Sequence, residues 1–368
     1  MATMNPAMSD ERVANVGFFR SLLLRPEVGA FLGAAAVYLL FALVASDNFP
    51  TVGGAARFLD PASTLGIMSV AVALLMIGGE FDLSAGTLTG STGLVMGILA
   101  VEMGLNIWVA MALSLIFALT VGFLNGLLVV KTSLPSFIVT LGSFFILRAL
   151  NVGVTRLVTN EVRVSDIDEA VGFVAARALF NTEVQLLGQT FRTSIFWWIL
   201  ITILVTWILL RTKYGNWIFC VGGDANAARS VGIPVERVKI SLFMATAGAA
   251  WLVGIMTALR LRSAVASQGI GQEFIYIISA VIGGCLLTGG YGSAIGASIG
   301  ALIFGMTRVG IVFAGWDTDW FFGFLGVMLL VAVIVNNFTR QKAKDFHVGA
   351  VKAAKAAKAK NDGQQEET

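Results

Sequence analysis

The chain has 368 residues, of which 57% are hydrophobic and only 13% are charged, and its formal net charge is +3 at pH 7. Because a soluble domain carries about 25% charged residues, these proportions exclude an ordinary soluble protein and indicate an all-α, polytopic integral membrane protein. A single histidine and two cysteines exclude a histidine-based zinc site and give no disulfide pattern.

Ten apolar segments are long enough to cross a membrane, since a span takes roughly 17–25 apolar residues. They are residues 28–45, 62–78, 83–101, 107–130, 135–154, 194–210, 240–259, 274–287, 294–313 and 320–338. The eighth is short and glycine-rich, so we expect a broken or re-entrant element there. Residues 1–27 are then a short lead, without the features of a cleaved signal peptide. Residues 28–338 form one membrane domain, and 339–368 form a Lys/Ala-rich tail.

Positive charge predicts the orientation of these spans. Ten spans put both termini on one side, and that side also holds the loop 211–239, which is rich in Lys and Arg. We therefore expect both termini and this loop to be cytoplasmic. The lysines of the tail favour contact with anionic membrane lipid, although a solvated tail is the simpler explanation.

Two carboxylates stand in the sequence GGEFDLSAG, residues 78–86, between the second and third segments. A charge at the bilayer centre costs roughly 2.5–3.5 kcal/mol on insertion scales, so the Gly-Gly pair is expected to break the helix and turn them towards a polar site. Asp82 is predicted to cap the third segment by accepting from the backbone N–H of Ser84 or Ala85; lining a substrate path is the alternative. For Glu80, a substrate-facing, a gating and an interfacial role all stay open.

Two glycine-rich regions occupy matching places in the two halves of the chain, and each starts with a Gly-Gly pair. The glycines recur three or four residues apart, at Gly86, Gly90, Gly93 and Gly97 in the third segment and at Gly292, Gly296 and Gly300 after the eighth. Such spacing allows close helix packing, and interrupted segments at corresponding positions predict the inverted-repeat core of a transporter.

The loop 211–239 contains a predicted short helix at residues 225–231. Asp224 or Asn226 is placed to cap its start, and Gly232 is placed to end it in a left-handed conformation. A short helix on this face of a membrane protein is a candidate docking element, and an ordinary interhelical loop is the alternative.

Several function classes lack their sequence signals. The nearest approach to a phosphate-binding loop, GLLVVKT at residues 126–132, lacks the second glycine, so we expect no ATPase site in this chain. The charged residues within or beside the spans are only Glu80, Asp82, Arg148 and Arg308. This is a small number of intramembrane charges for an ion-coupled secondary transporter. That class is kept as the alternative to the function inferred next.

Four motifs in order resemble the permease subunit of bacterial ABC importers of the ribose/simple-sugar (branched-chain amino acid/ribose-type) family, over about residues 62–337. GGEFDLSAG resembles the family's GGIDLSVGS, with Glu80 and Phe81 where a single apolar residue is usual. Residues 122–150, with NG, LPSFIVTLG and Arg148, resemble NG…LPPFIATLG…R. Residues 222–240 resemble GGN..AA..SGI.V.RVK, and residues 280–303 resemble GG..LTGG.GS..GA..GALI.

The resemblance implies a non-enzymatic subunit of the bacterial inner (plasma) membrane that imports a monosaccharide or polyol; a nucleoside or a furanosyl signalling compound is the alternative. It implies a second permease copy or paralogue, cytoplasmic ABC ATPase subunits that hold ATP and Mg, and a periplasmic substrate-binding protein. It implies no cofactor in this chain and no nucleic acid. The 211–239 loop becomes the coupling segment, and the coupling residues are Asn226, Ala227, Ala228 and Gly232.

Polar residues near the predicted breaks are the candidates for lining the substrate path. They are Glu80, Asp82, Ser84, Asn125, Thr140, Gln272 and Glu273. For each of them, helix packing or capping is the competing explanation. The segments 156–192 and 260–274 lie on the side opposite the coupling loop, and orientation makes them the candidate dock for the binding protein.

Overall fold

The structure is a computed structural model that describes residues 26–334, and most of these residues are helical. The long helices are α2 (Pro26–Val44), α3 (Val52–Ile77), α4 (Ala85–Gly97) with its π-helical continuation η1 (Ile98–Glu102), α5 (Ile107–Thr132), α6 (Ser136–Thr159), α8 (Thr193–Arg211), α11 (Val235–Leu261) and α13 (Ala294–Phe313). The shorter helices are η2 (Ile167–Glu169), α7 (Phe173–Phe180), α9 (Lys213–Gly223), α10 (Ala225–Ser230), α12 (Gln272–Ile282) and a last helix, Trp320–Ile334.

The predicted all-α membrane architecture is confirmed. Eight helices of the described part are long and apolar enough to cross a membrane, and the two remaining predicted spans coincide with α12 and with the helix Trp320–Ile334. The eighth span is broken, as expected, since α12 has only 11 residues. The predicted end of the tenth span, most of the 1–27 lead and the 339–368 tail lie outside the described residues.

The predicted start of the second span, residue 62, is wrong by ten residues, because α3 already begins at Val52. The Thr51 hydroxyl caps this earlier start by accepting from the Gly54 N–H at 2.9 Å. Arg57 and Asp60, which have the polarity of a loop, therefore lie inside the helix.

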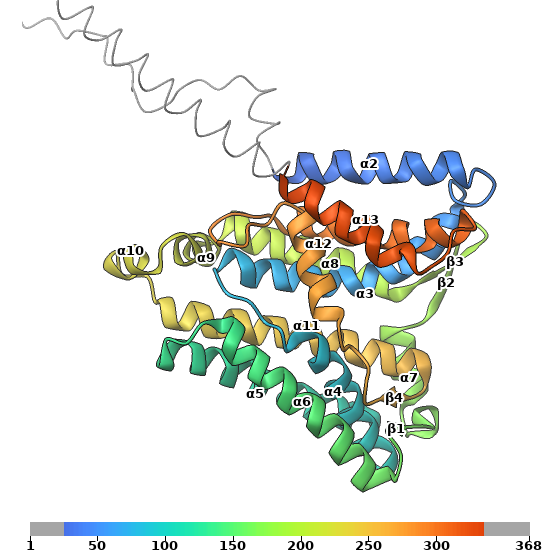
Figure 1. Cartoon of the computed structure of the whole chain (residues 1–368). Coiled ribbons are helices and arrows are strands. Elements are labelled where there is room, and N and C mark those ends of the chain that lie inside the picture. Colours follow the sequence, from blue (N-terminus) through green and yellow to red (C-terminus); the bar gives the residue numbers. More distant parts are fainter. Residues whose placement is uncertain (1–25, 335–368) are drawn as a thin grey trace, which may run out of the picture.

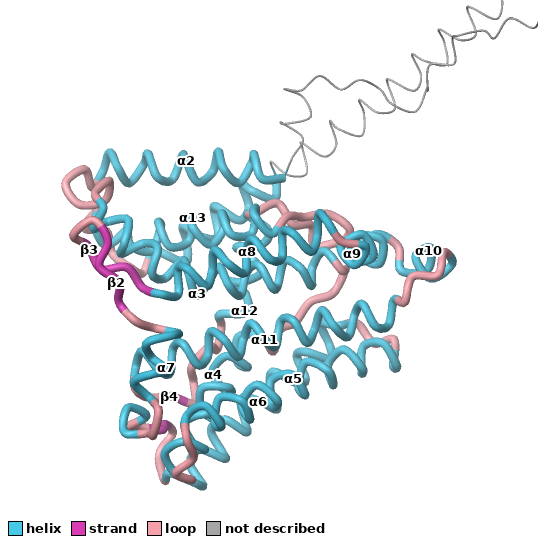
Figure 2. Tube along the Cα trace, turned by 180° about the vertical axis from the view of Figure 1, so that it is seen from behind, coloured by secondary structure: helices cyan, strands magenta, loops and turns pink. Residues whose placement is uncertain are grey.

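The helices form two layers (Figure 1). α2, α13, α3 and α8 make one layer, and α11, α4, α5 and α6 make the other, with α12 crossing between them. The view from behind shows the same division (Figure 2). The helices in the middle of this arrangement carry the core, and 78% of the membrane-span window is buried in both α3 and α4 with η1.

The two ends of the bundle differ in structure. One end carries α9 and α10, and the start of α2 lies at this end (Figure 1). The other end carries α7 and the only strands of the described part: β1 (Arg163–Val164) pairs with β4 (Ala264–Val265), and β2 (Glu183–Leu186) forms an antiparallel hairpin with β3 (Gln189–Arg192).

Glycines allow helix backbones to approach closely in the core, as the sequence predicts for close packing. An added Cβ at Gly254 of α11 would lie 2.1 Å from Thr92 Oγ1 and 2.3 Å from the Thr89 carbonyl oxygen, both in α4. At Gly90 of α4 it would lie 2.2 Å from the Gln268 carbonyl oxygen. The packing of α4 therefore depends on the absence of side chains at these two positions.

We predict that Gly254→Val destabilises the protein by about 1–3 kcal/mol, because the new side chain has to displace backbone. The measurement is the thermal unfolding midpoint of the purified protein in detergent. Gly326→Val is the matched control, since an added Cβ at Gly326 meets nothing within 4 Å. Equal midpoints for the two variants would contradict the packing described for α4.

Candidate functional site

The first break in the core follows α3, at the sequence Ile77-Gly78-Gly79. The Glu80 N–H donates to the Leu75 carbonyl oxygen at 3.2 Å, and the Gly79 N–H donates to the Met76 carbonyl oxygen at 2.9 Å. This pair of bonds is a Schellman motif, which needs a left-handed residue, and Gly79 has φ +84°. The helix therefore stops within the membrane domain with its last carbonyls satisfied.

The second break follows α12 and has the same geometry. The Cys285 N–H donates to the Ala280 carbonyl oxygen at 3.0 Å, the Gly284 N–H donates to Val281 at 2.9 Å, and Gly284 has φ +92°. The predicted pair of breaks in the two halves of the chain is thus confirmed. The inverted relation between the halves stays a prediction, since these two breaks alone do not test it.

Side chains of α6 hold the segment between α3 and α4. The Phe81 N–H donates to Ser136 Oγ and the Leu83 N–H donates to Thr140 Oγ1, both at 3.1 Å. Thr140 is fully buried. The extended backbone between the two helices therefore finds its hydrogen-bond partners on a neighbouring helix rather than in water, as a membrane interior requires.

Asp82 is the centre of a buried hydrogen-bond network. Its Oδ1 accepts from the Ser84 N–H at 2.8 Å and from the Ser84 hydroxyl at 2.6 Å. Asn125 of α5 donates through Nδ2 to Ser84 Oγ at 3.0 Å, and Ser143 of α6 donates to Asn125 Oδ1 at 2.5 Å. Asp82 is 1% exposed, and its Oδ2 has no hydrogen-bond partner among residues 26–334. The geometry is that of the predicted capping contact with Ser84.

Four of the seven path candidates are therefore brought together by the fold. The four residues that are each at most 2% exposed are Asp82, Ser84, Asn125 and Thr140. In this conformation their hydrogen bonds connect the segment between α3 and α4 to α5 and α6. Their contact with a solute remains a prediction.

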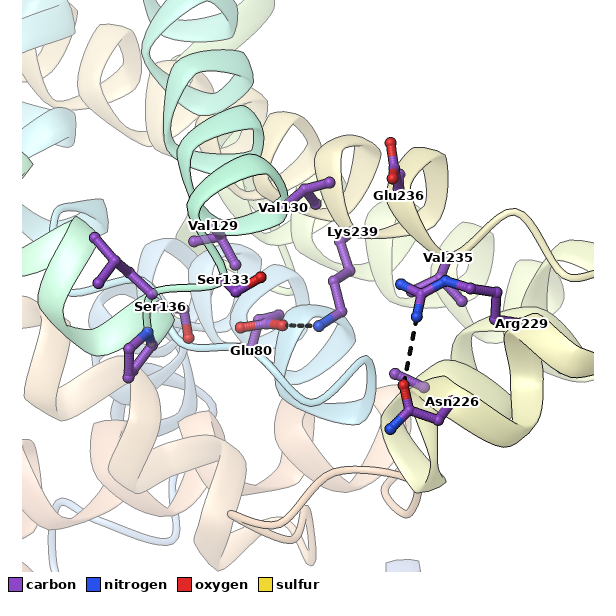
Figure 3. Close-up of a pocket in the computed structure, with 13 residues that line it drawn as sticks. Glu80, Val129, Val130, Ser133, Ser136, Asn226, Arg229, Val235, Glu236 and Lys239 are labelled. Carbon is purple, nitrogen blue, oxygen red and sulfur yellow. Dashed lines mark hydrogen bonds and ion pairs between the residues drawn. The ribbon is translucent and has the colours of Figure 1, made fainter.

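Glu80 points away from this network, towards Lys239 in the second turn of α11, with which it forms an ion pair. The Glu80 side chain is 7% exposed and that of Lys239 is 21% exposed. Figure 3 shows the pair at the edge of a cavity of about 390 Å³, lined also by Ser136, Asn226 and Arg229. Glu80 thus lies between the first break and α10, and the substrate-facing, gating and interfacial roles all stay predictions.

The predicted short helix of the 211–239 loop is present as α10, and its docking role stays a prediction. Asp224 Oδ1 accepts from the Asn226 N–H at 2.8 Å and from the Ala227 N–H at 3.0 Å, and Gly232 has φ +84° as its predicted stop requires. Asn226, Ala227 and Gly232 are exposed, whereas Ala228 is 3% exposed and faces the protein. The helix ends at Ser230, slightly before the predicted residue 231.

The sequence analysis missed α9, which precedes α10 and was taken for polar loop. Its start carries a cap that is visible in the sequence, since the Thr212 hydroxyl accepts from the Gly215 N–H at 3.1 Å. In the sequence, Ile218 and Val221 stand among polar residues and glycines, so an apolar helix face is not evident there. In the structure both residues are buried.

Four glycines form a junction between α9 and both breaks; we call Gly79, Gly222, Gly289 and Gly290 the glycine junction. An added Cβ at Gly222, at the end of α9, would lie 1.8 Å from the Ile77 carbonyl oxygen and 2.8 Å from the Gly290 nitrogen. At Gly289 it would lie 2.6 Å from the Gly222 carbonyl oxygen and 2.7 Å from Gly79 Cα. The segment leading into α10 therefore contacts the chain beyond both breaks, backbone against backbone.

The two remaining path candidates lie apart from the Asp82 network. Glu273 is 2% exposed and accepts from the Gly271 N–H with both carboxylate oxygens at 3.1 Å, close to Gly86 of α4. Gln272 lines a second cavity of about 630 Å³ between α3, α11, α12 and α13.

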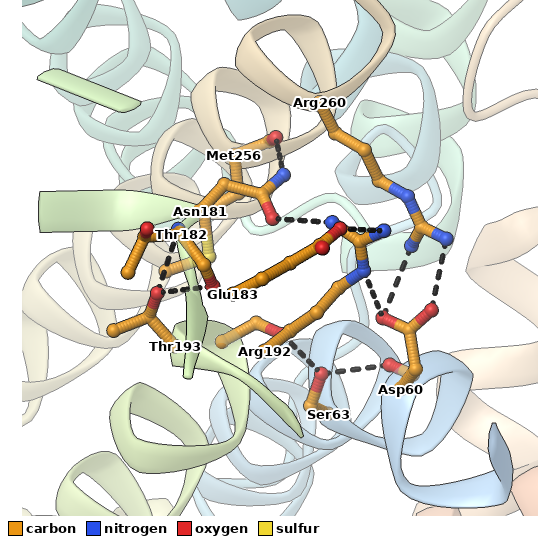
Figure 4. A network of polar contacts seen from close by, with 10 residues as sticks. Asp60, Ser63, Asn181, Thr182, Glu183, Arg192, Thr193, Met256 and Arg260 are labelled. Atoms are coloured by element: carbon orange, nitrogen blue, oxygen red, sulfur yellow. Dashed lines mark hydrogen bonds and ion pairs between the residues drawn. The ribbon is translucent and has the colours of Figure 1, made fainter. Parts of the chain in front are cut away.

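An ion-pair cluster at the end of the bundle opposite α10 was not foreseen (Figure 4). The Asp60 carboxylate of α3 accepts from the two terminal guanidinium nitrogens of Arg260 at 3.1 and 2.8 Å, and Arg192 Nε of β3 lies 3.5 Å from Asp60 Oδ1. Arg192 also pairs with Glu183 of β2 at 3.0 Å. The cluster fixes the β2–β3 hairpin to α3 and α11.

We predict that Asp82→Leu lowers the stability of the protein by about 1–3 kcal/mol, because it leaves the buried Ser84 N–H without its acceptor. Asp82→Asn keeps an oxygen at the Oδ1 position and should unfold close to the parent temperature. Thermal unfolding in detergent compares the two variants. If Asp82→Asn were as unstable as Asp82→Leu, the negative charge and not the capping geometry would hold the segment.

We expect Glu80 and Lys239 to depend on each other. Glu80→Gln and Lys239→Met should each slow solute uptake, and the double variant should be no slower than either single one, since the ion pair is already lost. Uptake into vesicles at equal protein amount measures this. If the loss of uptake rate in the double variant were the product of the two single losses, the two residues would act separately.

Comparisons with known proteins agree over most of the chain. Residues 54–333 match the family described as branched-chain amino acid transport system / permease component. The ribose import permease protein of Escherichia coli (strain K12) is 33% identical over 82% of this chain and 92% of its own length. The fructose import permease protein of Rhizobium meliloti is 28% identical, covering 83% of each chain. The xylose transport system permease protein of Escherichia coli (strain K12) is 26% identical over 93% of this chain and all of its own. No solved structure matches.

Proposed function

The chain belongs to the branched-chain amino acid transport system / permease component family, and we propose that it is the membrane-spanning subunit of an ATP-driven sugar importer of the bacterial inner membrane. The observation that carries this proposal is the contact of α9, which leads directly into α10, with the two breaks through the glycine junction. A helix that only connected two spans would not need backbone contact with both halves of the core.

Cytoplasmic ABC ATPase subunits are the proposed partners of α10. Asn226, Ala227 and Gly232 face outward and are available to a partner, whereas the buried Ala228 seats the helix on the protein. ATP and Mg belong to that partner, and this chain contributes no catalytic residue and no cofactor. With α10 cytoplasmic, the start of α2 is cytoplasmic too, since it lies at the same end (Figure 1).

A monosaccharide or polyol is the proposed solute, in line with the ribose, fructose and xylose in the names of the relatives. A nucleoside or a furanosyl compound is the alternative within the same architecture. A periplasmic binding protein would deliver the solute at the end that carries α7 and the β2–β3 hairpin, where the Asp60 cluster gives a rigid platform. The ion-coupled alternative gains no support from the relatives.

Isolation of the intact complex tests this proposal. We expect the tagged protein, purified in mild detergent from its native cells, to bring an ATPase subunit with it in stoichiometric amount. Mass spectrometry of the small molecules released from the associated binding protein would name the solute. A protein that purified alone, and still supported uptake into vesicles without ATP, would contradict the proposal.

We predict that Ala227→Trp abolishes ATPase binding and ATP-driven uptake while leaving the fold intact, because Ala227 is exposed on a helix and its new side chain blocks only the outer face. Gly232 is less suitable, since any side chain there is strained at φ +84°. Co-purification of the ATPase and uptake are the measurements. Arg237→Trp, an exposed site at the start of α11, is the control. An Ala227→Trp variant that keeps its ATPase would exclude α10 as the dock.

A further inference from the structure

The cavity of about 630 Å³ between α3, α11, α12 and α13 is a cleft within the chain. It starts at the end of the bundle opposite α10, where Arg57 and Arg260 line it, and it reaches Gln272 of α12, which crosses between the two layers (Figure 1). Sites for small molecules have volumes of about 300–1,000 Å³. In the proposed orientation, this cleft lies on the periplasmic side of α12.

The lining of the cleft has an excess of positive charge. Its charged residues are Arg57 and Asp60 of α3, Arg260 of α11 and Arg308 of α13. The carboxylate of Asp60 already accepts from Arg260 and also lies 3.5 Å from Arg192 (Figure 4). The acid of this cleft is therefore shared between two arginines, and it leaves Arg57 and Arg308 without a counter-charge.

Arg57 and Arg308 have free guanidinium groups. The side chain of neither forms a hydrogen bond or an ion pair within residues 26–334. Arg57 lies over the ring of Phe313, with 5.5 Å between its Cζ and the ring centroid, and stacking of this kind leaves the N–H groups at the edge of the guanidinium available. Glu273, at the start of α12, turns its carboxylate to the Gly271 N–H instead of towards the arginines.

The two arginines lie at about the same depth. α3 and α13 pack side by side in opposite directions (Figure 1), and an added Cβ at Gly305 of α13 would lie 2.4 Å from the Phe58 carbonyl oxygen and 2.7 Å from Ala62 Cβ of α3. Arg308 follows Gly305 by one turn, and Arg57 precedes Phe58, so both lie towards the same end of that contact. Like charges that line one cleft repel each other, and a bound anion would offset this repulsion.

The rest of the lining suits a molecule that carries hydroxyl groups as well as a charge. Thr64 and Gln272 line the cleft, and their side chains form no hydrogen bond within the described part of the chain. Apolar faces from Leu65, Val253 and Phe304 complete the lining. The acyl chain of a lipid would leave the hydroxyl and the amide unpaired, which is unfavourable, so the lining favours a dissolved polar solute over a lipid.

We propose that Arg57 and Arg308 bind the carboxylate of a sugar acid in this cleft, so that the solute of the importer is an acidic monosaccharide, an aldonate or a uronate. A guanidinium binds a carboxylate through two parallel N–H···O bonds, and the sugar hydroxyls take Thr64 and Gln272 as partners. This inference rests on the proposed import function, and it narrows the monosaccharide or polyol of that function to its acidic members.

The charge preference of a thiol in the cleft tests for the anion site. Thr64→Cys is made in the full chain with its own Cys220 and Cys285 replaced by alanine. Its rate of modification by a sulfonate methanethiosulfonate reagent is divided by its rate with the trimethylammonium reagent. We expect this ratio to be at least tenfold higher than at Thr190→Cys, an exposed site on β3. Equal ratios at the two sites, or no reaction at Thr64→Cys, would overturn the proposal.

Substitution of the arginines assigns the preference. Arg57→Gln and Arg308→Gln, alone and together, should lower the ratio at Thr64→Cys towards that of the control site. Arg156→Gln removes the same charge from an exposed position in the last turn of α6, outside the cleft, and should leave the ratio unchanged. A ratio that falls equally in all these variants would assign the preference to the net charge of the protein and overturn the proposal.

Protection from the sulfonate reagent identifies the anion. We expect gluconate or glucuronate at millimolar concentration to slow modification of Thr64→Cys at least threefold, and glucose and sorbitol at the same concentration to leave the rate unchanged. The measurement is repeated in nanodiscs of phosphatidylcholine with and without phosphatidylglycerol. Protection by phosphatidylglycerol, without protection by either sugar acid, would assign the site to a lipid headgroup and overturn the proposal.

The ligand of the associated binding protein separates this inference from the import function. An acidic sugar among the small molecules that it releases would support the proposal. A neutral sugar, released from a complex that also contains the ATPase, would overturn only this inference. A protein that purifies alone and takes up solute without ATP would contradict the import function itself.

Discussion

Backbone polar groups inside a membrane have no water to bond with, and this constraint organises the core. Both breaks close the ends of their helices with the same Schellman bonds, and the segment between α3 and α4 takes further partners from Ser136 and Thr140. A broken helix therefore dictates where its neighbours lie, because α6 has to present its hydroxyls at the height of the break. The Asp82 network adds α5 to the same arrangement through Asn125.

Much of the fold follows from local sequence properties. Apolar length alone predicts the spans, and the Ile-Gly-Gly pairs predict the two breaks, since only glycine adopts the required left-handed conformation without strain. The start of α3 could not be predicted in this way, because Arg260, the ion-pair partner of Asp60 within the helix, is 200 positions away in the sequence. α9 was missed for a similar reason, as its buried face is evident only when the core it packs against is known.

The candidate site was predictable in its residue types but not in its geometry. Two carboxylates only two residues apart take opposite directions: Asp82 turns into the protein and bonds to Ser84, while Glu80 turns towards α10 and pairs with Lys239. Neither direction can be read from GGEFDLSAG, because it depends on how the chain leaves the left-handed Gly79. Likewise, the sequence identifies Arg148 as an intramembrane charge, but only the packing of α6 shows that the protomer leaves it uncovered.

The glycine junction has a consequence for how force travels through the molecule. Side chains between two helices accommodate small displacements by changing rotamer, whereas a contact between two backbones without side chains cannot do so. A displacement of α9 at Gly222 would therefore bear directly on Gly79 and on Gly289, one at each break, so the two halves of the core share one mechanical contact with the segment that leads into α10.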